Sequence, residues 1–412
     1  MTDGAPAADG TAPGYDRGST GYRRLLVALF CAGIATFAQL YAPQAALPLV
    51  AADLGVDAED AALLVSVATL GLALGVLPWS AVADRYGRVR TITVGLCGAT
   101  ALGLAVPFAP GLGLLLAGRF VEGLFVGAVP AVALAYLTEE VRPLHVARAA
   151  GTYVAGTTVG GLAGRLVAGP VADLAGWRAG VLAVSVLCAL AAAGFVLLAP
   201  ASRVFVPQPR RRDRVPGDGL ARRVAANLRS PRQLALYAQG FLLMGGFVAL
   251  YNYLGFRLSA PPFVLPQALT SLLFVAYLAG TWSSSRAGGI ASRRGRLPVL
   301  LGGTALFAGG AALTLAGSLV VVVAGLVVAI AGFFAAHAVA SGWTAAEASV
   351  GRAQAASLYN FAYYAGSSLL GWLGGVAFTR GGWGGTVALI VGAAALAAAV
   401  ATAVLGRAVA RR

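Results

Sequence analysis

Twelve apolar stretches, each long enough to cross a lipid bilayer, constrain this chain more than any other feature. A helix needs ~20 predominantly apolar residues to span a hydrocarbon layer of about 30 Å. The stretches cover residues 25–44, 60–82, 91–109, 113–135, 149–171, 178–198, 234–256, 267–285, 297–316, 318–340, 354–376 and 384–405. Their number and length predict an all-α integral membrane protein with twelve transmembrane helices.

The composition supports the bilayer as the solvent of this chain. Only 11% of the residues are charged and 59% are hydrophobic, whereas about a quarter of an average soluble domain is charged. The net charge of +15 lies in short strips between the apolar stretches. We therefore assign the basic residues to membrane topology and expect no nucleic-acid partner.

The arginines also predict the orientation. If the N-terminus is inside, only Arg178, Arg257 and Arg380 fall on the outer side. The inner side then carries the basic segment 200–233 and Arg85, Arg88, Arg90, Arg142, Arg148, Arg286, Arg293, Arg294, Arg296, Arg352, Arg407, Arg411 and Arg412. By the positive-inside rule, we expect a multi-pass protein of a bacterial inner (plasma) membrane with both termini in the cytoplasm.

A Pro- and Arg-rich segment divides the twelve stretches into two sets of six. The predicted organisation is a disordered cytoplasmic tail (1–24), an N-terminal six-helix bundle (25–199), a basic cytoplasmic linker (200–233), a C-terminal six-helix bundle (234–406) and a basic cytoplasmic tail (407–412). The first tail contains almost no large apolar side chains, so it cannot bury enough surface to become ordered.

The two sets of six resemble each other in sequence. "DRYGR" (Asp84–Arg88) and "SRRGR" (Ser292–Arg296) lie 208 residues apart, and "ARAAGTY" (Ala147–Tyr153) and "AQAASLY" (Ala353–Tyr359) lie 206 apart. Repeats in the same orientation predict two bundles related by a pseudo-two-fold axis along the membrane normal. A site at their interface, near the midplane of the membrane, is then expected.

Several motifs resemble those of one transporter family. "GVLPWSAVADRYGR" (Gly75–Arg88) is similar to the signature turn between the second and third helices of the major facilitator superfamily, and "RFVEG" (Arg119–Gly123) to a pattern in its fourth helix. "AQGFLLMGGFV" (Ala238–Val248) and "ASLYNFAYYAGSS" (Ala356–Ser368) resemble the YnfM-type branch of inner-membrane transport proteins, close to the drug and sugar efflux carriers. The resemblance implies a carrier that works by alternating access.

The signature turn is a candidate conformational gate. Its residues are Gly75, Asp84, Arg85, Gly87 and Arg88, and the counterparts in the second half are Arg293, Gly295 and Arg296. An Asp at a helix end can pair with arginines and with helix dipoles across the interface between the halves. Ser292 replaces this Asp in the second half, so the gate should be one-sided. The alternative is that these arginines only obey the positive-inside rule.

Three charged residues lie inside predicted helices and are candidates for proton coupling: Arg119, Glu122 and Arg165. Counted along the helices, Arg119 and Arg165 reach similar depths, so Glu122 could pair with either. A carboxylate between two arginines could take up and release a proton as access alternates, whereas the simpler alternative is a static ion pair between helices. Arg165 replaces the proline of a glycine-rich antiporter motif, which leaves the direction of transport open.

Polar side chains in the second half form a candidate substrate cavity. They are Asn252, Tyr277, His337, Tyr359, Asn360 and Tyr363. Each of them alone is more often an interfacial or satisfied core residue than a ligand contact. Their shared position on four helices favours a partly polar cavity wall.

These observations predict a secondary active transporter, and no enzyme. We expect proton-coupled efflux (antiport) of a small organic solute such as a drug or sugar, by a monomer whose partners are the solute, protons and the lipid bilayer. No cofactor is expected beyond the proton gradient, and no metal site, because all three cysteines lie in apolar stretches. The alternatives are a symporter or facilitator for nutrient uptake, and a non-transporting receptor or scaffold that uses the basic linker.

Overall fold

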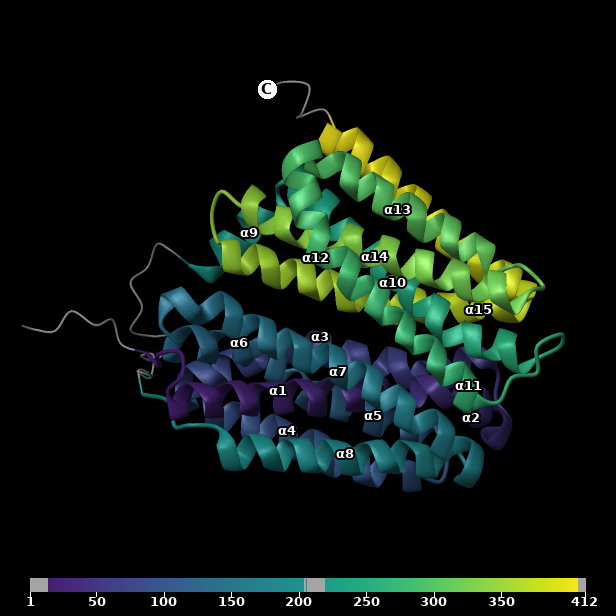
Figure 1. The fold of residues 1–412 in the computed structure, drawn as a ribbon, viewed down its shortest axis with the longest axis horizontal. Helices are drawn as coiled ribbons and strands as arrows, with labels where there is room; N and C mark the ends of the chain where they lie inside the picture. The colour runs from purple at the N-terminus through teal and green to yellow at the C-terminus, as the bar shows by residue number, and fades with distance from the viewer. Residues whose placement is uncertain (1–13, 204, 206–218, 407–412) are drawn as a thin grey trace, which may run out of the picture.

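The computed structural model describes residues 14–203, 205 and 219–406, and these residues are almost entirely helical (Figure 1). The first half contains α1 (Thr20–Tyr41), α2 (Leu47–Leu54), α3 (Ala58–Tyr86), α4 (Arg88–Ala105), α5 (Leu112–Val126), α6 (Ala128–Glu140), α7 (Pro143–Ala175) and α8 (Trp177–Leu198), with short turns η1 (Ala42–Ala46) and η2 (Val106–Phe108). The second half contains α9 (Leu220–Leu228), α10 (Pro231–Ser259), α11 (Gln267–Leu272), η4 (Leu273–Ala276), α12 (Tyr277–Arg294), α13 (Arg296–Leu313), α14 (Leu319–Glu347), α15 (Arg352–Val400) and η5 (Ala401–Leu405).

These elements form twelve membrane-length segments, as predicted. Several segments continue through a short turn, as α1 does into η1 and α2, and α15 is two helices joined at Gly382. Within the described residues, nine segments are long and apolar enough to span a membrane by length and composition, and one of them, Arg352–Leu405, contains two crossings. The remaining crossings are α7 and the α11–α12 segment, which are richer in Gly, Ser and Thr.

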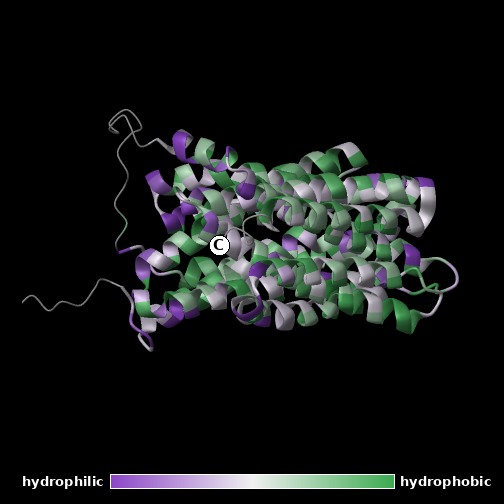
Figure 2. Ribbon diagram, turned by 90° about the horizontal axis from the view of Figure 1, so that it is seen from above, coloured by the Kyte–Doolittle hydropathy of each residue, from purple (hydrophilic) through white to green (hydrophobic). Residues whose placement is uncertain are grey.

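The helices form two bundles that lie against each other (Figure 1). Helices α1–α8 form one bundle and α10–α15 the other. We call the end at which α1 begins and α8 ends the linker end, and the end that carries α2 and α11 the far end. Hydrophobic residues cover the length of the helices, and hydrophilic residues gather toward the ends (Figure 2).

The backbone repeats between the halves as the sequence predicts. Gly87 between α3 and α4 has φ 100° and ψ 155°, and Gly295 between α12 and α13 has φ 89° and ψ 154°. Gly176 and Gly382, which are 206 residues apart, both have positive φ at the turn into the last helix of their halves. Such φ values strain residues with a Cβ atom, so glycine is needed at these turns.

Two predicted boundaries differ in the structure. The N-terminal segment predicted to be disordered up to residue 24 is helical from Thr20 on, and Ser19 caps this helix by accepting from the backbone N–H of Tyr22. Before it, Asp16 accepts a hydrogen bond from Arg142 at 2.7 Å, which fixes the chain to the α6–α7 turn.

The predicted linker also contains structure, because α9 and the first turn of α10 lie within 200–233. The remainder of the predicted tails and linker, residues 1–13, 204, 206–218 and 407–412, lies outside the described residues.

Polar contacts between the two halves lie at mid-depth and toward the far end. At mid-depth, the hydroxyls of Thr69 on α3 and Ser368 on α15 are 2.8 Å apart. Nearer the far end, the Gln44 amide donates to Asn252 Oδ1 on α10 at 2.6 Å. These contacts show that the two halves are closed against each other at the far end.

Candidate functional site

The middle of the first half contains a buried ion pair. Arg119 and Glu122, three residues apart on α5, are each 1% exposed, and Arg119 Nη1 lies 2.7 Å from Glu122 Oε2. The second carboxylate oxygen, Glu122 Oε1, is buried without a hydrogen-bond partner. A carboxylate with one oxygen that no protein group binds can accept a proton there without losing an existing hydrogen bond.

Arg119 also ties three helices together. It donates to the carbonyls of Gln39 and Leu40 on α1, at 3.2 and 2.5 Å, and to that of Leu64 on α3 at 3.0 Å. The helix ends at Tyr41, where the turn η1 begins with a proline at its second position, so the carbonyls of its last turn lack the usual partners four residues on. The Gln39 carbonyl accepts from the backbone N–H of Ala42 as well as from Arg119. Counting residues along the helices predicted that these charged side chains lie inside the membrane. It did not predict the backbone carbonyls that Arg119 binds.

Arg165 on α7 has a different environment. It is 1% exposed, and Nε donates to Gln44 Oε1 at 2.8 Å while Nη1 donates to the Gly161 carbonyl at 2.7 Å. Among the described residues no carboxylate forms an ion pair with it, so Glu122 pairs with Arg119 alone in this state. Aromatic rings surround the guanidinium instead, with centroids 4.4, 4.6 and 5.2 Å away, those of Tyr41, Phe274 and Tyr277.

The aromatic rings around Arg165 offset only part of the free-energy cost of burying its charge. An unpaired charge deep in a membrane costs at least about 2.5–3.5 kcal/mol on insertion scales. Each cation–π contact returns about 0.5–2 kcal/mol, and none of them supplies a negative charge. A net positive charge therefore remains at the boundary between the two halves.

The predicted cavity residues of the second half lie mostly in one aromatic group. His337 Nδ1 is 3.0 Å from the Tyr359 hydroxyl, and its ring is 4.8 Å from that of Tyr363. Phe333 stacks on His337 at 5.8 Å and on Phe247 at 4.1 Å. The rings continue to Tyr277 beside Arg165, since Phe247 and Tyr277 are 5.5 Å apart.

The other two predicted cavity residues, Asn252 and Asn360, do not belong to this aromatic group. Asn252 is 1% exposed and contacts Gln44 of the first half, as described above, whereas Asn360 is exposed and makes no hydrogen bond among the described residues. The phenylalanines of the aromatic group and Gln44 did not stand out in the sequence. A polar residue directly after Pro43, within an apolar stretch, is the signal that could have indicated Gln44.

Two of the predicted gate residues, Asp84 and Arg88, form an ion-pair cluster at the linker end of the first half. Arg88 lies 2.7 Å from Asp84 and 2.7 Å from Glu139, the latter on α6. Glu139 lies on the fourth membrane segment and is the second acidic partner of Arg88. It was not predicted from the sequence. The cluster therefore joins three helices of one half in this state, and Asp84 pairs with Arg88 of the same half.

The remaining gate residues have other contacts. Gly75 packs against the backbone of Leu124, and Arg85 lies over the ring of Tyr86. The counterparts Arg293, Gly295 and Arg296 are exposed, and Arg296 lies 5.9 Å from the ring of Trp343.

At the far end, one carboxylate joins the two halves. Asp173, in the last turns of α7, accepts hydrogen bonds from the backbone N–H groups of Gln267 and Ala268 at 3.0 and 2.6 Å. These are the first residues of α11, whose N-terminal N–H groups have no partner within the helix. The negative charge is also favoured by the helix dipole. Asp173 thus acts as a cap supplied by the opposite half.

We expect Asp173→Ala to shift the protein toward a state that is open at the far end, by about 1–2 kcal/mol or roughly tenfold in population. Asp173→Asn should have a smaller effect, because the amide oxygen still accepts one bond. Distances between spin labels at the exposed far-end positions Phe108 and Leu315 would measure the shift. Asp57→Asn, an exposed far-end acid without such a contact, is the control, and equal distances in all variants would contradict the prediction.

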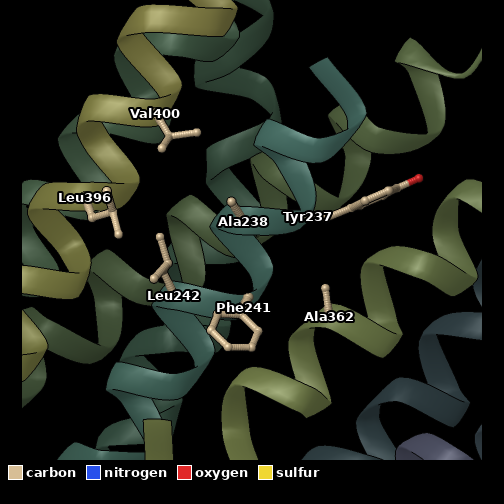
Figure 3. Close-up of a pocket in the computed structure, with 7 residues that line it drawn as sticks. All are labelled: Tyr237, Ala238, Phe241, Leu242, Ala362, Leu396 and Val400. Carbon is tan, nitrogen blue, oxygen red and sulfur yellow. The ribbon is translucent and has the colours of Figure 1, made fainter. Parts of the chain in front are cut away.

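A separate apolar cavity of about 390 Å³ lies in the second half (Figure 3). Its lining residues come from α10 and α15: Tyr237, Ala238, Phe241, Leu242, Ala362, Leu396 and Val400. It contains none of the predicted site residues and none of the buried charges. We therefore do not include it in the site.

Two six-helix bundles, closed against each other at one end around buried charges and aromatic rings, define a membrane carrier with alternating access. The sequence model of the Major Facilitator Superfamily matches residues 25–285, and the chain belongs to this superfamily. It is accordingly a multi-pass membrane transporter for small-molecule solutes.

Relatives in two bacteria cover nearly the whole chain. The inner membrane transport protein YnfM of Escherichia coli K12 is 42% identical over 395 residues, which are 94% of this chain and 94% of YnfM. The MFS-type transporter YybF of Bacillus subtilis 168 is 33% identical over 374 residues, 91% of each chain. The predicted superfamily and its YnfM-type branch are thus confirmed.

Solved structures share the fold. A bacterial homologue of the human lysosomal transporter Spinster, crystallised in an inward-facing, unoccupied conformation, superposes with a TM-score of 0.76 at 17% identity, covering 94% of this chain and 99% of that one. A mutant of the nucleoside transporter NupG gives a TM-score of 0.75 at 14% identity, covering 92% and 99%. At these identities the likeness establishes the fold alone.

Proposed function

We propose that this transporter exports a small organic solute, such as a drug or sugar, in exchange for protons. The observation that carries the proposal is the buried Arg119–Glu122 pair, in which Glu122 Oε1 has no partner. A static ion pair would be expected to satisfy both oxygens, because an unsatisfied buried acceptor is costly. A proton carrier needs one oxygen available for the proton.

The linker end is proposed to face the cytoplasm of a bacterial inner membrane. The arginine distribution supports this orientation through the positive-inside rule, and YnfM is named an inner membrane protein. Both termini are then cytoplasmic, and the far end, closed by Asp173, faces outward. We propose that the chain works as a monomer, because both bundles and the site between them belong to one chain.

Coupling then follows from the contacts of Arg119. Protonation of Glu122 removes its charge and weakens its bond to Arg119, which also binds the carbonyls of α1 and α3. A change at Glu122 is thereby transmitted to the helices that meet the second half. The Asp84–Arg88–Glu139 cluster is the proposed gate, which rearranges when the linker end closes and α3 approaches the second half.

We expect Glu122→Gln to abolish proton-driven transport while the protein stays folded. Glutamine keeps the size of the side chain and can accept from Arg119, but it cannot carry a proton between two states. The assay uses proteoliposomes with an acidic interior and inside-out protein, with ethidium, lactose and 3-phenylpropanoate as probes. An antiporter loads such vesicles, whereas a symporter loads them only when the gradient is reversed.

The control is Glu347→Gln, which removes a carboxylate that pairs with Arg232 at 2.6 Å at the linker end. It should retain gradient-driven transport. Wild-type rates in Glu122→Gln would exclude Glu122 from coupling, and loading only under the reversed gradient would replace export by uptake.

A further inference from the structure

Arg165 differs from the other deeply buried arginine in its partners. Arg119 and Arg165 are both 1% exposed, yet only Arg119 has a carboxylate beside it. The hydrogen-bond acceptors of Arg165, Gln44 Oε1 and the Gly161 carbonyl, are neutral. A buried guanidinium whose hydrogen-bond partners are all neutral has its charge balanced only when an anion binds beside it.

The site of Arg165 is made by both halves. Tyr41 and Gln44 come from the first half, and Phe274 and Tyr277 from the second. Carriers with this repeat architecture bind their solutes at the interface of the two halves. A group bound by Arg165 would therefore be in contact with the elements that move relative to each other.

Two further polar groups near Arg165 are buried without partners. Gln44, which accepts from Arg165, donates to Asn252 Oδ1, and this leaves Asn252 Nδ2 unpaired. The Tyr251 hydroxyl is also unpaired, and its ring stacks on Phe274 at 4.6 Å and lies 5.3 Å from Tyr277. An amide N–H₂ group is only a donor, and a phenol can donate, so both suit an oxygen anion.

A row of aromatic rings extends from this position into the second half, with Tyr277 and His337 partly exposed and Phe247 and Phe333 buried between them. Tyr277, Phe247, Phe333 and His337 follow one another with ring centroids 5.5, 4.1 and 5.8 Å apart. The partly exposed rings favour a flat, apolar body through stacking and edge contacts, and the buried phenylalanines hold them in place. With one arginine and neutral donors, the polar end of the site balances a single negative charge.

We propose that the solute is an aromatic organic acid whose carboxylate binds Arg165 and Asn252 and whose ring lies against Tyr277 and His337, the partly exposed rings of the aromatic group. This inference rests on the proposed function as a solute exporter and names its substrate class. Arg165 then takes part in coupling through the charge of the solute, and Glu122 through the proton. The two buried arginines have separate tasks.

Equilibrium binding to the purified full-length protein tests the substrate class independently of transport. The probes are benzoate, 3-phenylpropanoate and indole-3-acetate, each compared with its amide, with 3-phenylpropylamine as the cation. Binding is measured by the shift in thermal unfolding and by quenching of tryptophan fluorescence. We expect the acids to bind more tightly than their amides, and Arg165→Gln to weaken acid binding about 10- to 100-fold.

Two further variants keep the test decisive. Arg165→Lys retains the charge and should keep part of the affinity for the acids, even if Arg165→Gln does not fold. Arg286→Gln is the matched control, because Arg286 also lies over an aromatic ring, Trp282 at 4.2 Å, but on an exposed surface. It should bind like the wild type.

Acids that bind no better than their amides would overturn the proposal, as would unchanged acid affinity in Arg165→Gln. Proton-driven export of ethidium or lactose without any preference for acids would refute this substrate class and leave the proposed function intact. Acid binding without any gradient-driven flux would refute the proposed proton-coupled export and leave the substrate class intact.

Discussion

Arg119→Gln is expected to destabilise the folded protein by about 3–5 kcal/mol, because it leaves Glu122 as a buried charge without its partner. The substitution also removes donors from the carbonyls of Leu40 and Leu64, which belong to two other helices. Thermal unfolding of the purified protein in detergent measures the loss as a fall in the melting temperature.

The control for this prediction is Arg178→Gln. Arg178 also forms an ion pair, with Asp53 at 3.3 Å, but the two side chains are 38% and 50% exposed. Exposed pairs contribute about 0–1 kcal/mol, so the melting temperature should change little. Arg119→Leu combined with Glu122→Leu should recover part of the stability but no proton coupling. A wild-type melting temperature for Arg119→Gln would contradict the buried ion pair.

The sequence predicted the repeat and the number of helices because both depend on local patterns. Apolar length determines which segments cross the membrane, and glycine is needed wherever φ is positive. The pairs Gly87 with Gly295 and Gly176 with Gly382 therefore appear both in the sequence offsets and in the backbone angles. The contact of Arg119 with Glu122 is equally local, since residues three apart share a helix face.

The partner of Arg165 could not be predicted in the same way. Counting residues along a helix gives the depth of a side chain but not the direction in which the helix face points. Arg165 and Arg119 lie on different helices, and the turn after Tyr41 brings Gln44 rather than Glu122 to Arg165. Glu139 and Asp173 were missed as partners for the same reason, because their contacts depend on how separate helices pack.

Close helix packing determines the position of the Arg119–Glu122 ion pair. On α5, Gly123 follows Glu122 directly, and a Cβ at Gly123 would lie 2.1 Å from the carbonyl oxygen of Ala68 on α3. A Cβ at Gly71 of α3 would lie 2.3 Å from the carbonyl oxygen of Phe120 in return. Glycines on both helices thus allow the backbones to touch. This contact keeps α5 in the rotation at which Arg119 reaches Leu64.

We therefore expect Gly123→Ala to destabilise the protein by about 1–3 kcal/mol and Gly123→Val by about 3 kcal/mol or more, because the two helices must separate. The measurements are thermal unfolding and proton-driven transport, and both should decline together as Arg119 loses its α3 acceptor. Gly113→Ala, on the same helix but with open space around the added methyl group, is the matched control. It should be neutral or stabilising by up to about 1 kcal/mol through helix propensity.

A second substitution separates backbone contact from side-chain crowding. The atom nearest to a Cβ at Gly123 is the backbone oxygen of Ala68, so shortening that side chain in Ala68→Gly cannot make room for it. Gly123→Ala should remain destabilised in the double variant. If Ala68→Gly restored both stability and transport, the two helices would be separated by side chains, and the position of Arg119 would have to depend on its hydrogen bonds alone.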